Sequence, residues 1–417
     1  MRILVISQYF WPENFRINDL VAELVNRGHE LTVLTGKPNY PRGEIFPEFL
    51  AAPQAYNSFE GAEVVRVGLL PRGRGGLRLM LNYLSFMISA SVVGSWKLRG
   101  RKVEAIFVFE PSPITIGIPA IVLKWLKRAP IAFWVLDLWP QSLEAVGAVR
   151  SRAVLRLVDH LVRFIYRHCD AVLAQSRSFM TAIGEQIDDP KRIIYFPSWA
   201  EPAPTIDSVI PAPEIEARPD LFDIVFTGNV GEAQDFAAVL MAAQALRNEP
   251  VRWIIVGDGR KSAWLAEEVQ RLNLQDQVLL PGRFGLDRMP SFFRHADALL
   301  VSLRNEPIFA LTIPGKLQSY LGAGIPILAM LNGEGAEIVT TSGAGMAVAA
   351  GDGAGLAEAV LKMRMLDPEQ RAKMGERGLA CIAKQFDRDK LIAQLEGILF
   401  TLEQGVKTRR DFEGVNG

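Results

Sequence analysis

The chain has 417 residues, of which 49% are hydrophobic and 22% are charged. This length predicts two or three domains with large cores, and the composition excludes a disordered or collagen-like chain. Lys and Arg number 46 together, as do Asp and Glu, which disfavours a nucleic-acid-binding protein. Cys169 and Cys381 fit no metal-ligand or redox spacing, so they indicate a reducing compartment and no structural zinc.

The N-terminus and the charge distribution narrow the class further. The first apolar run, residues 3–7, is far too short for a signal peptide, so we expect a cytoplasmic protein. Residues 1–200 contain 24 basic and 17 acidic residues, so the first half is basic and the second half is equally acidic. No acidic residue occurs between Glu63 and Glu104, the only large stretch with charges of a single sign.

Short β-branched runs alternate with helical patterns in the first half. Residues 3–7, an amphipathic segment at 18–26 that stops at Gly28, and residues 31–35 predict a first βαβ unit. The runs mostly look fully buried, which favours a parallel sheet covered on both faces, hence a doubly wound α/β domain over residues 1–197. Further strands are expected at 64–67, 105–109, 131–136, 171–174 and 193–196.

A second domain is expected after a proline-rich linker over residues 198–219, where little apolar periodicity occurs. The strand and helix pattern then restarts and predicts a second parallel α/β domain over residues 220–385. Residues 386–417 predict a C-terminal helix able to pack back on the first domain, with a frayed tail from Gly405. The strands of the second domain are expected at 223–227, 252–256, 278–280, 298–301 and 326–329.

Ligands of open parallel sheets bind beyond the carboxyl ends of the strands, so the loops there are the candidate sites. In the second half, loops 228–234 and 257–261 combine glycine with polar or basic residues. Glycine lets backbone amides approach a phosphate, and the following helix N-terminus supplies free N–H groups. The alternative is a set of tight turns without a ligand. Neither the dinucleotide fingerprint nor a P-loop is present, which disfavours hydride transfer and ATP hydrolysis.

The segment 306–329 is the most specific of the second half. It places Lys316 near a helix start, with Ala323 and Gly324 closing that helix. A diphosphate bound there would meet both the helix dipole and the ammonium group. The alternative interpretation of Lys316 is a solvated surface lysine.

The corresponding loops of the first half mix aromatic residues with carboxylates and amides, a lining that suits sugar rings and hydroxyl groups. Glu13 and Asp137 are candidate catalytic or substrate-holding groups. Alternatively, Glu13 caps the following helix and Asp137 satisfies loop amides. The four histidines lie beside no serine or cysteine nucleophile in such a loop, so triad hydrolysis is disfavoured and all four are interpreted as structural.

The acid-free stretch contains an apolar segment at 77–96 between basic flanks. Its length allows a membrane span, but Asn82, several serines and the surrounding α/β pattern favour an interfacial or buried helix. Basic flanks on an apolar helix suit an anionic lipid surface, and a core helix with solvated ends is the alternative. The candidate membrane residues are Arg74, Arg78, Leu79, Tyr83, Phe86, Lys97, Arg99 and Arg101.

Several of these motifs together resemble one family. The chain is similar, over nearly its whole length, to the family four glycosyltransferases of GT-B fold, in particular the WbuB and WcaI-like group of O-antigen, capsule and colanic acid assembly. The residues that carry this resemblance are segments 6–20, 27–30, 35–41, 137–140, 228–234, 257–260 and 306–329.

The resemblance implies two Rossmann-like domains facing across a cleft, with a nucleotide sugar on the second and an acceptor on the first. It implies metal-independent hexosyl transfer without a cofactor, in which Glu13, Asp137 and Lys316 would be the catalytic residues. The implied donor-binding residues are Gly228, Asn229, Gly231, Asp258, Arg260, Arg283, Phe284, Glu306, Phe309, Pro314, Lys316 and Ser319. The implied acceptor-binding residues are Asn14, Arg16, Asn39, Tyr40, Trp139 and Gln141.

This chain departs from the broader family at two places. The family's glutamate pair, of which the second often holds the ribose, corresponds here to Leu311 and Ser319. The family's histidine in the cleft loop is replaced by the sequence Asp-Leu-Trp-Pro at 137–140. The basic pair after the first strand of the second domain is replaced by Asn229 and Glu232, so Lys316 and Arg260 are the candidates for that charge.

The expected function is transfer of a sugar from UDP to a polyprenyl-diphosphate-linked saccharide at the inner face of the cytoplasmic membrane. An N-acetylated 6-deoxyhexose such as N-acetyl-L-fucosamine is the expected sugar. One alternative is a UDP-sugar 2-epimerase of the same fold, which would need no acceptor. The other is a degenerate transferase that acts as a scaffold, which the missing glutamate pair suggests.

Overall fold

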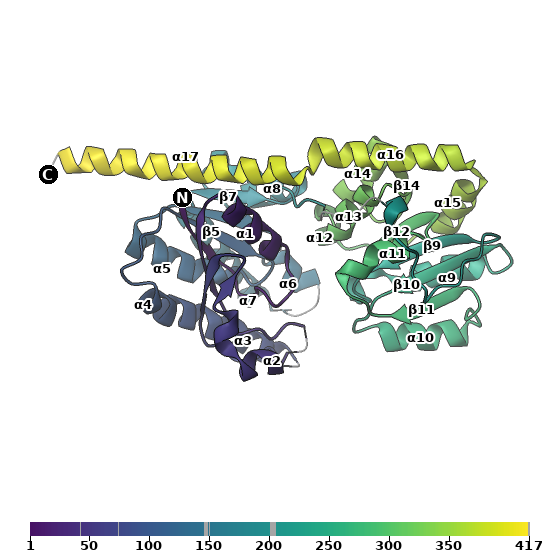
Figure 1. Ribbon diagram of the computed structural model, residues 1–417, viewed down its shortest axis with the longest axis horizontal. Coiled ribbons are helices and arrows are strands. Elements are labelled where there is room, and N and C mark those ends of the chain that lie inside the picture. Colours follow the sequence, from purple (N-terminus) through teal and green to yellow (C-terminus); the bar gives the residue numbers. More distant parts are fainter. Residues whose placement is uncertain (42, 74, 146–148, 150, 201–205, 416–417) are drawn as a thin grey trace. The chain divides into compact units, whose positions relative to one another are not determined.

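The computed structural model describes the chain except for residues 42, 74, 146–148, 150, 201–205 and 416–417. The chain forms two compact units (Figure 1). The first unit comprises residues 1–196 together with 389–417, and the second comprises residues 197–388. Each unit is an α/β domain built on one sheet.

The first unit contains an eight-stranded sheet in the order β3-β4-β2-β1-β5-β6-β7-β8, parallel except for the short β3. Its central strands are buried along almost their whole length, as the apolar runs of the sequence predict. Strand β3, which has only two residues, was not predicted from the sequence. The strands are β1 (Arg2–Ile6), β2 (Glu30–Thr35), β3 (Ser58–Phe59), β4 (Ala62–Arg66), β5 (Ala105–Glu110), β6 (Ile131–Val135), β7 (Ala171–Ala174) and β8 (Ile193–Tyr195).

Helices pack against this sheet: α1 contacts β2 and β4, α5 contacts β5 and β6, and α5 also contacts α3, α4 and α7. A π-helical turn at Ala90–Gly94 joins α3 to α4 without a break in the helical path. The helices are α1 (Arg16–Asn26), α2 (Pro47–Ala51), α3 (Gly76–Ser89), α4 (Ser95–Lys97), α5 (Gly117–Lys127), α6 (Gln141–Ala145), α7 (Arg152–His168), α8 (Arg177–Gly184) and α17 (Arg388–Val415).

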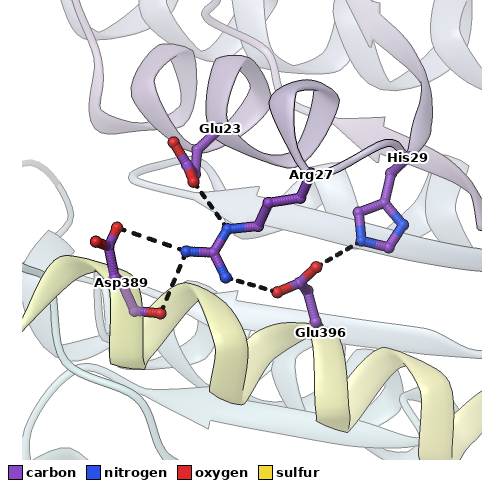
Figure 2. A network of polar contacts seen from close by, with 5 residues as sticks. All are labelled: Glu23, Arg27, His29, Asp389 and Glu396. Atoms are coloured by element: carbon purple, nitrogen blue, oxygen red, sulfur yellow. Dashed lines mark hydrogen bonds and ion pairs between the residues drawn. The ribbon is translucent and has the colours of Figure 1, made fainter.

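The last helix, α17, packs back on the first unit through an ion-pair network (Figure 2). Arg27 at the end of α1 contacts Glu396 at 2.9 Å and Asp389 at 3.5 Å, and His29 contacts Glu396 at 2.7 Å. Beside these pairs α17 buries an apolar stripe that includes Ile392, Leu395 and Leu399. The expected frayed tail from Gly405 was wrong, because the helix continues to Val415.

The second unit contains a six-stranded parallel sheet in the order β11-β10-β9-β12-β13-β14. A buried ion pair between Asp223 of β9 and Arg252 of β10, at 2.6 Å, joins two neighbouring strands. Strand β14 was not predicted from the sequence, because it is only half-buried and contains a single β-branched residue. The strands are β9 (Phe222–Thr227), β10 (Val251–Val256), β11 (Val278–Gly282), β12 (Ala298–Ser302), β13 (Ile327–Met330) and β14 (Gly345–Val348).

Two apolar clusters on opposite faces of this sheet form the core of the second unit. Its helices are α9 (Phe236–Ala245), α10 (Ser262–Arg271), α11 (Met289–Phe293), α12 (Pro307–Leu311), α13 (Gly315–Ala323), α14 (Glu334–Ser342), α15 (Gly353–Met365) and α16 (Pro368–Gln385).

The C-terminal part of the expected linker, residues 206–219, is packed rather than extended. Ala212 and Ile215 are buried in the core of the second unit. The Ala212 amide donates to the Ser291 carbonyl at 3.0 Å, and Arg252 donates to the Glu216 carbonyl at 2.9 Å. The proline content therefore marks an irregular segment that belongs to the second unit, while residues 201–205 of the expected linker lie outside the described residues.

Candidate functional site

Two glycine-containing loops meet at the carboxyl ends of β9 and β10. Gly228 and Gly257 have φ angles of +127° and +153°, which side chains rarely allow. A Cβ atom on Gly257 would lie 1.8 Å from the Gly228 carbonyl oxygen. The Gly228 amide donates to Val256, and the Val230 amide donates to Asp258 at 3.0 Å. The backbones of the two loops are thus in direct contact, which favours glycine at both positions.

Lys316 lies against the loop that contains Gly228 and not in solvent. Its Nζ atom is 3.8 Å from the centre of the Phe226 ring and 3.5 Å from the position that a Cβ on Gly228 would take. This nitrogen is buried and has no hydrogen-bond partner among the described residues. Burial lowers the pKa of Lys316 to about 7. The structure therefore contradicts the interpretation of a solvated surface lysine.

Helix α13 holds Lys316 in this place. The hydroxyl group of Tyr320 accepts a hydrogen bond of 2.8 Å from the amide of Thr227, the last residue of β9. Tyr320 lies one turn after Lys316, and both side chains contact the end of the same strand. Pro314 precedes the first helical residue, so the free N–H groups of α13 follow it directly. Ser319 is half-buried on the same helix.

The other expected donor residues differ in their exposure and bonding. Arg260 and Arg283 are exposed, and Phe284 packs against Phe292 with ring centres 4.7 Å apart. Asp258 accepts from the Gly259 amide, and the half-buried Phe309 lies in α12. Asn229 and Gly231 lie in the loop after β9, where the Gly231 amide donates to Gln234.

Two ion pairs lie near these loops. Glu232 pairs with Lys261 at 3.1 Å. Lys261 was not among the residues expected from the sequence, although it lies in the same loop as Arg260, which was. Glu306 precedes α12 and pairs with Arg304 at 3.5 Å.

In the first unit, Glu13 joins the loops that follow β1 and β2. Its Oε1 atom accepts hydrogen bonds from the amides of Asn39 (2.8 Å) and Tyr40 (2.7 Å), and Oε2 accepts from the Phe10 amide at 3.2 Å. Burial outweighs these bonds and raises the pKa of Glu13 to about 7. Glu13 does not cap α1, since Phe15 occupies the cap position without a side-chain bond.

The residues around Glu13 divide into buried and accessible ones. Asn39 is buried, its amide group donates to the Lys37 carbonyl, and its oxygen accepts from the Arg72 amide. Asn39 therefore holds the loops and is closed to an acceptor. Tyr40 is exposed and lies 5.2 Å from the Phe15 ring. Asn14 is also exposed, and Arg16 is half-buried at the first residue of α1.

Asp137 follows β6 and accepts hydrogen bonds from two side chains, the Trp139 indole at 3.1 Å and the Ser142 hydroxyl. Burial raises its pKa. Trp139 is buried, so it is placed to hold Asp137 rather than to contact an acceptor. Gln141 is the first residue of α6. Glu110, the last residue of β5, was not selected from the sequence and is fully buried near Asp137. An acid at the end of a buried apolar strand is the signal that could have found it.

The helical segment Gly76–Lys97 exposes much of its apolar surface. Leu77 and Trp96 are 68% and 62% exposed, and Met80, Leu81 and Ile88 are also exposed. Leu79 is half-buried. Of the candidate membrane residues, Tyr83 and Phe86 are buried in the unit, with Phe86 1% exposed, so their side chains do not lie on its surface. The segment is long and apolar enough to cross a membrane by length and composition alone.

The basic residues near this segment have mixed surroundings. Arg78, Lys97 and Arg99 are exposed, and the Arg99 guanidinium lies 4.2 Å from the centre of the Trp96 ring. Arg101 forms an ion pair with Glu63. Arg74 lies outside the described residues.

Within the described residues, no group of three or more His, Cys, Asp or Glu side chains could hold a metal ion. Of the histidines, His29 contacts Glu396, and the ring of His295 lies 2.9 Å from the Ala212 carbonyl oxygen. These contacts fit the structural role expected for both.

Two family models match the chain, one to each unit. The model described as "Glycosyl transferase 4-like domain" matches residues 14–199, and the model described as "Glycosyl transferases group 1" matches residues 222–364. The chain belongs to the family four glycosyltransferases of GT-B fold. The resemblance, the fold class and the glycosyltransferase activity expected from the sequence are thereby confirmed.

Relatives support the same assignment. The putative colanic acid biosynthesis glycosyl transferase WcaI of Escherichia coli K12 is 28% identical over 78% of this chain and 82% of its own length. The probable glycosyltransferase WbjE of Pseudomonas aeruginosa is 31% identical over 53% of this chain and 57% of its own length. The crystal structure of Anabaena HepE in complex with UDP and glucose matches in fold, with a TM-score of 0.68 and 16% identity over 96% of this chain and 99% of that chain.

Proposed function

We propose that this glycosyltransferase moves a hexosyl residue from a UDP-sugar to a polyprenyl-diphosphate-linked saccharide during assembly of a bacterial O-antigen or capsule. The transfer uses no metal ion, and an N-acetylated 6-deoxyhexose such as N-acetyl-L-fucosamine is the sugar that the resemblance favours. The single observation that carries the proposal is the buried ammonium group of Lys316 beside Gly228, which has no hydrogen-bond partner in the described part of the chain.

A donor diphosphate is the ligand that this arrangement fits. A buried cation without a partner is unfavourable in the free protein, and an anion removes that cost. The glycine loop lets oxygen atoms approach the backbone, and the N-terminus of α13 adds N–H groups directly beside Lys316. When the bond to the sugar breaks, charge grows on the leaving diphosphate, and these fixed donors stabilise it.

The remaining donor contacts follow from the strand ends around Lys316. Arg283 and the Phe284 ring are proposed to hold the base, and Asp258 and Arg260 to lie along the nucleotide. Glu306, Phe309 and Ser319 are proposed to face the sugar and ribose. UDP is the proposed nucleotide because one crystal structure of HepE is a complex with UDP and glucose, and another is a complex with UDP-glucose.

The acceptor is proposed to bind on the first unit. Asn14, Arg16, Tyr40 and Gln141 offer amide, guanidinium and aromatic groups for a saccharide, and Asp137 offers a carboxylate for a hydroxyl group. Glu13, Asn39 and Trp139 hold the loops that carry these groups. The names of WcaI and of the lipopolysaccharide core transferase LpsD from Rhizobium meliloti support a role in polysaccharide assembly.

A lipid-linked acceptor requires access to a membrane surface, and the helices of the first unit support this. Besides the segment Gly76–Lys97, α5 exposes Trp125 and Leu126, and α7 exposes Leu157 and Phe164. Exposed basic residues accompany them, including Arg128, Arg156 and Arg167. A surface that combines apolar and basic side chains suits anionic lipid. We therefore propose peripheral association with the inner face of the cytoplasmic membrane.

The test measures thermal stability of the purified protein with UDP, GDP or dTDP, each with and without EDTA. A ligand at a hundred times its dissociation constant stabilises by about 2.7 kcal/mol. A UDP-selective shift that survives EDTA and is lost in Lys316→Met supports the proposal. Lys373→Met is the matched control, since Lys373 is exposed on α16 and pairs with Glu369.

Turnover then separates transfer from the alternatives. UDP release that depends on a polyprenyl-diphosphate saccharide supports transfer to lipid. Conversion of a UDP-sugar without any acceptor would instead identify an epimerase. UDP binding without turnover on a broad acceptor panel would identify a scaffold.

A further inference from the structure

Glu110 is a buried acid of this chain that the proposed function leaves unused. Other buried acids are compensated: Glu13 accepts three amide hydrogen bonds, and Asp223 forms a two-bond pair with Arg252. Glu110 is fully buried, and neither of its carboxyl oxygens makes a hydrogen bond of normal geometry with a described residue. A charge in such a place is strongly unfavourable unless it is paired.

The surroundings of Glu110 contain acids and phenols. Glu110 ends β5 opposite Val135 of β6, and its carboxyl group lies near the amides of Leu136 and Asp137. The titratable side chains that interact with it are Asp137 after β6, Tyr83 of α3 and Tyr166 of α7. Among the described residues, the groups that shift the pKa of Glu110 include no lysine or arginine, whereas Arg72 acts on the pKa of Tyr83.

Asp137 differs from Glu110 in having donors for a negative charge. The Trp139 indole and the Ser142 hydroxyl donate to it, and the Ser112 hydroxyl also stabilises its charged form. The Ser112 hydroxyl lies 3.5 Å from that of Tyr83, so this network reaches α3. Ser112 itself has a φ of +132°, a strained conformation for a residue with a side chain. The chain thus accepts backbone strain at a residue that contacts Asp137.

Two interacting carboxyl groups in a buried site disfavour each other's ionisation. Hydrogen-bond donors favour the charge on Asp137, and Glu110, which lacks them, is the better place for a proton. We propose that Glu110 is a positioning residue that carries the single proton of the Glu110–Asp137 pair, which keeps Asp137 ionised as the hydrogen-bond acceptor for the acceptor substrate's hydroxyl group. This role rests on the proposed acceptor site, but the protonation state of the pair is independent of it.

The first experiment reads that protonation state without any substrate. Infrared difference spectra of the wild type and of Glu110→Gln are compared at about pH 8.5, where Glu13 is ionised because its pKa is about 7. The carbonyl band of a protonated carboxylic acid is expected in the wild type and absent in Glu110→Gln. Glu104→Gln, six residues earlier and ion-paired with Arg2, is the control and should keep the band. No such band in the wild type would overturn the proposal.

The second experiment reads the effect on transfer. Glu110→Gln keeps a neutral group of the same shape, so we expect kcat near neutral pH within about threefold of the wild type. The wild type should lose activity at high pH as Glu110 ionises beside Asp137. This alkaline limb should move upward by at least about one pH unit in Glu110→Gln, a tenfold change in proton concentration. An unchanged limb, or loss of activity at neutral pH in a folded Glu110→Gln protein, would refute the positioning role.

The two experiments separate the two proposals. If no acceptor supports turnover, the proposed transfer fails while the infrared band still decides which carboxyl holds the proton. If transfer occurs and the band is present but the pH profile is unaffected, the transferase assignment stands and the role of Glu110 falls. A folded Asp137→Asn variant adds a further check, because removing the neighbouring charge should let Glu110 ionise at lower pH and weaken its band.

Discussion

The ammonium nitrogen of Lys316 lies 3.8 Å from the centre of the Phe226 ring and 3.5 Å from the position that a Cβ atom on Gly228 would take. The aromatic face offers partial stabilisation to a cation, but it satisfies none of the three N–H donors. The site is therefore formed in advance for an anion. The protonation of Lys316 should therefore change when the ligand binds.

Binding of UDP should be accompanied by proton uptake. Burial lowers the pKa of Lys316 to about 7, so above that pH the free protein holds it largely neutral. A bound diphosphate favours the charged form and raises this pKa. Calorimetry at about pH 8 in buffers of different ionisation enthalpy should give close to one proton taken up in the wild type. Lys373→Met should behave like the wild type, and uptake that persists in a UDP-binding Lys316→Met would exclude Lys316 as its source.

Glu13 should make the protein less stable as the pH rises. Its folded pKa of about 7 lies above the ordinary value of 4.5, so its contribution is complete below pH 4.5 and is lost as the pH passes through 7. The shift corresponds to about 3 kcal/mol. Urea unfolding at several pH values should show Glu13→Gln losing that much less stability than the wild type. If the free energy of unfolding depends on pH in the same way in both proteins, the raised pKa of Glu13 is contradicted.

The buried ion pair of the second unit should be costly to break. Asp223 and Arg252 are both almost fully buried, and Asp223→Asn leaves the guanidinium group without its counter-charge. We expect a loss of about 3–5 kcal/mol in the free energy of unfolding. Arg218→Ala, which breaks an exposed pair with Asp220, should change the free energy of unfolding far less. Equal effects of the two substitutions would show that burial does not determine the cost.

Lipid binding should depend on the exposed residues of the segment Gly76–Lys97. Leu77→Glu combined with Trp96→Glu places charge on two exposed apolar positions, so co-sedimentation with anionic vesicles should fall severalfold. Binding of the wild type should weaken with salt, because exposed charges are screened beyond about 10 Å at 0.1 M. Met365→Glu changes a similarly exposed residue of α15 and should have no effect. If the wild type does not bind anionic vesicles at low salt, the membrane proposal is refuted.

The ion pairs of α17 should hold this helix to the first unit. Glu396→Ala removes the partner of both Arg27 and His29 (Figure 2), which should increase hydrogen exchange over residues 389–399. The expected loss of stability is about 1 kcal/mol, since the pairs are partly exposed. Glu369→Ala, which removes an exposed pair on α16, is the control and should leave exchange in α17 unchanged.

Most strands could be predicted because they are continuous apolar runs, and burial on both faces leaves few alternatives for such segments. Strand β14 could not, since Gly345 and Ala347 have weak strand preference and the edge position places little demand on them. Tyr83 and Phe86 were included among the candidate membrane residues because composition reveals an apolar helix but not which of its faces is buried. Lys316 could be identified from its place near a helix start. The position of Glu110 at the end of an apolar strand could have marked it as a buried acid, but its pairing with Asp137, which follows the neighbouring strand β6, could not be seen in the sequence.

The return of α17 to the first unit has a consequence for synthesis. Residues 1–196 emerge from the ribosome first, yet the apolar stripe of Ile392, Leu395 and Leu399 that completes their packing is translated only after the whole second unit. The first unit therefore exposes an apolar strip until α17 has been synthesised, while the second unit folds. Fragments that stop before residue 389 keep that strip exposed, so they should be prone to aggregation even though their sheet is complete.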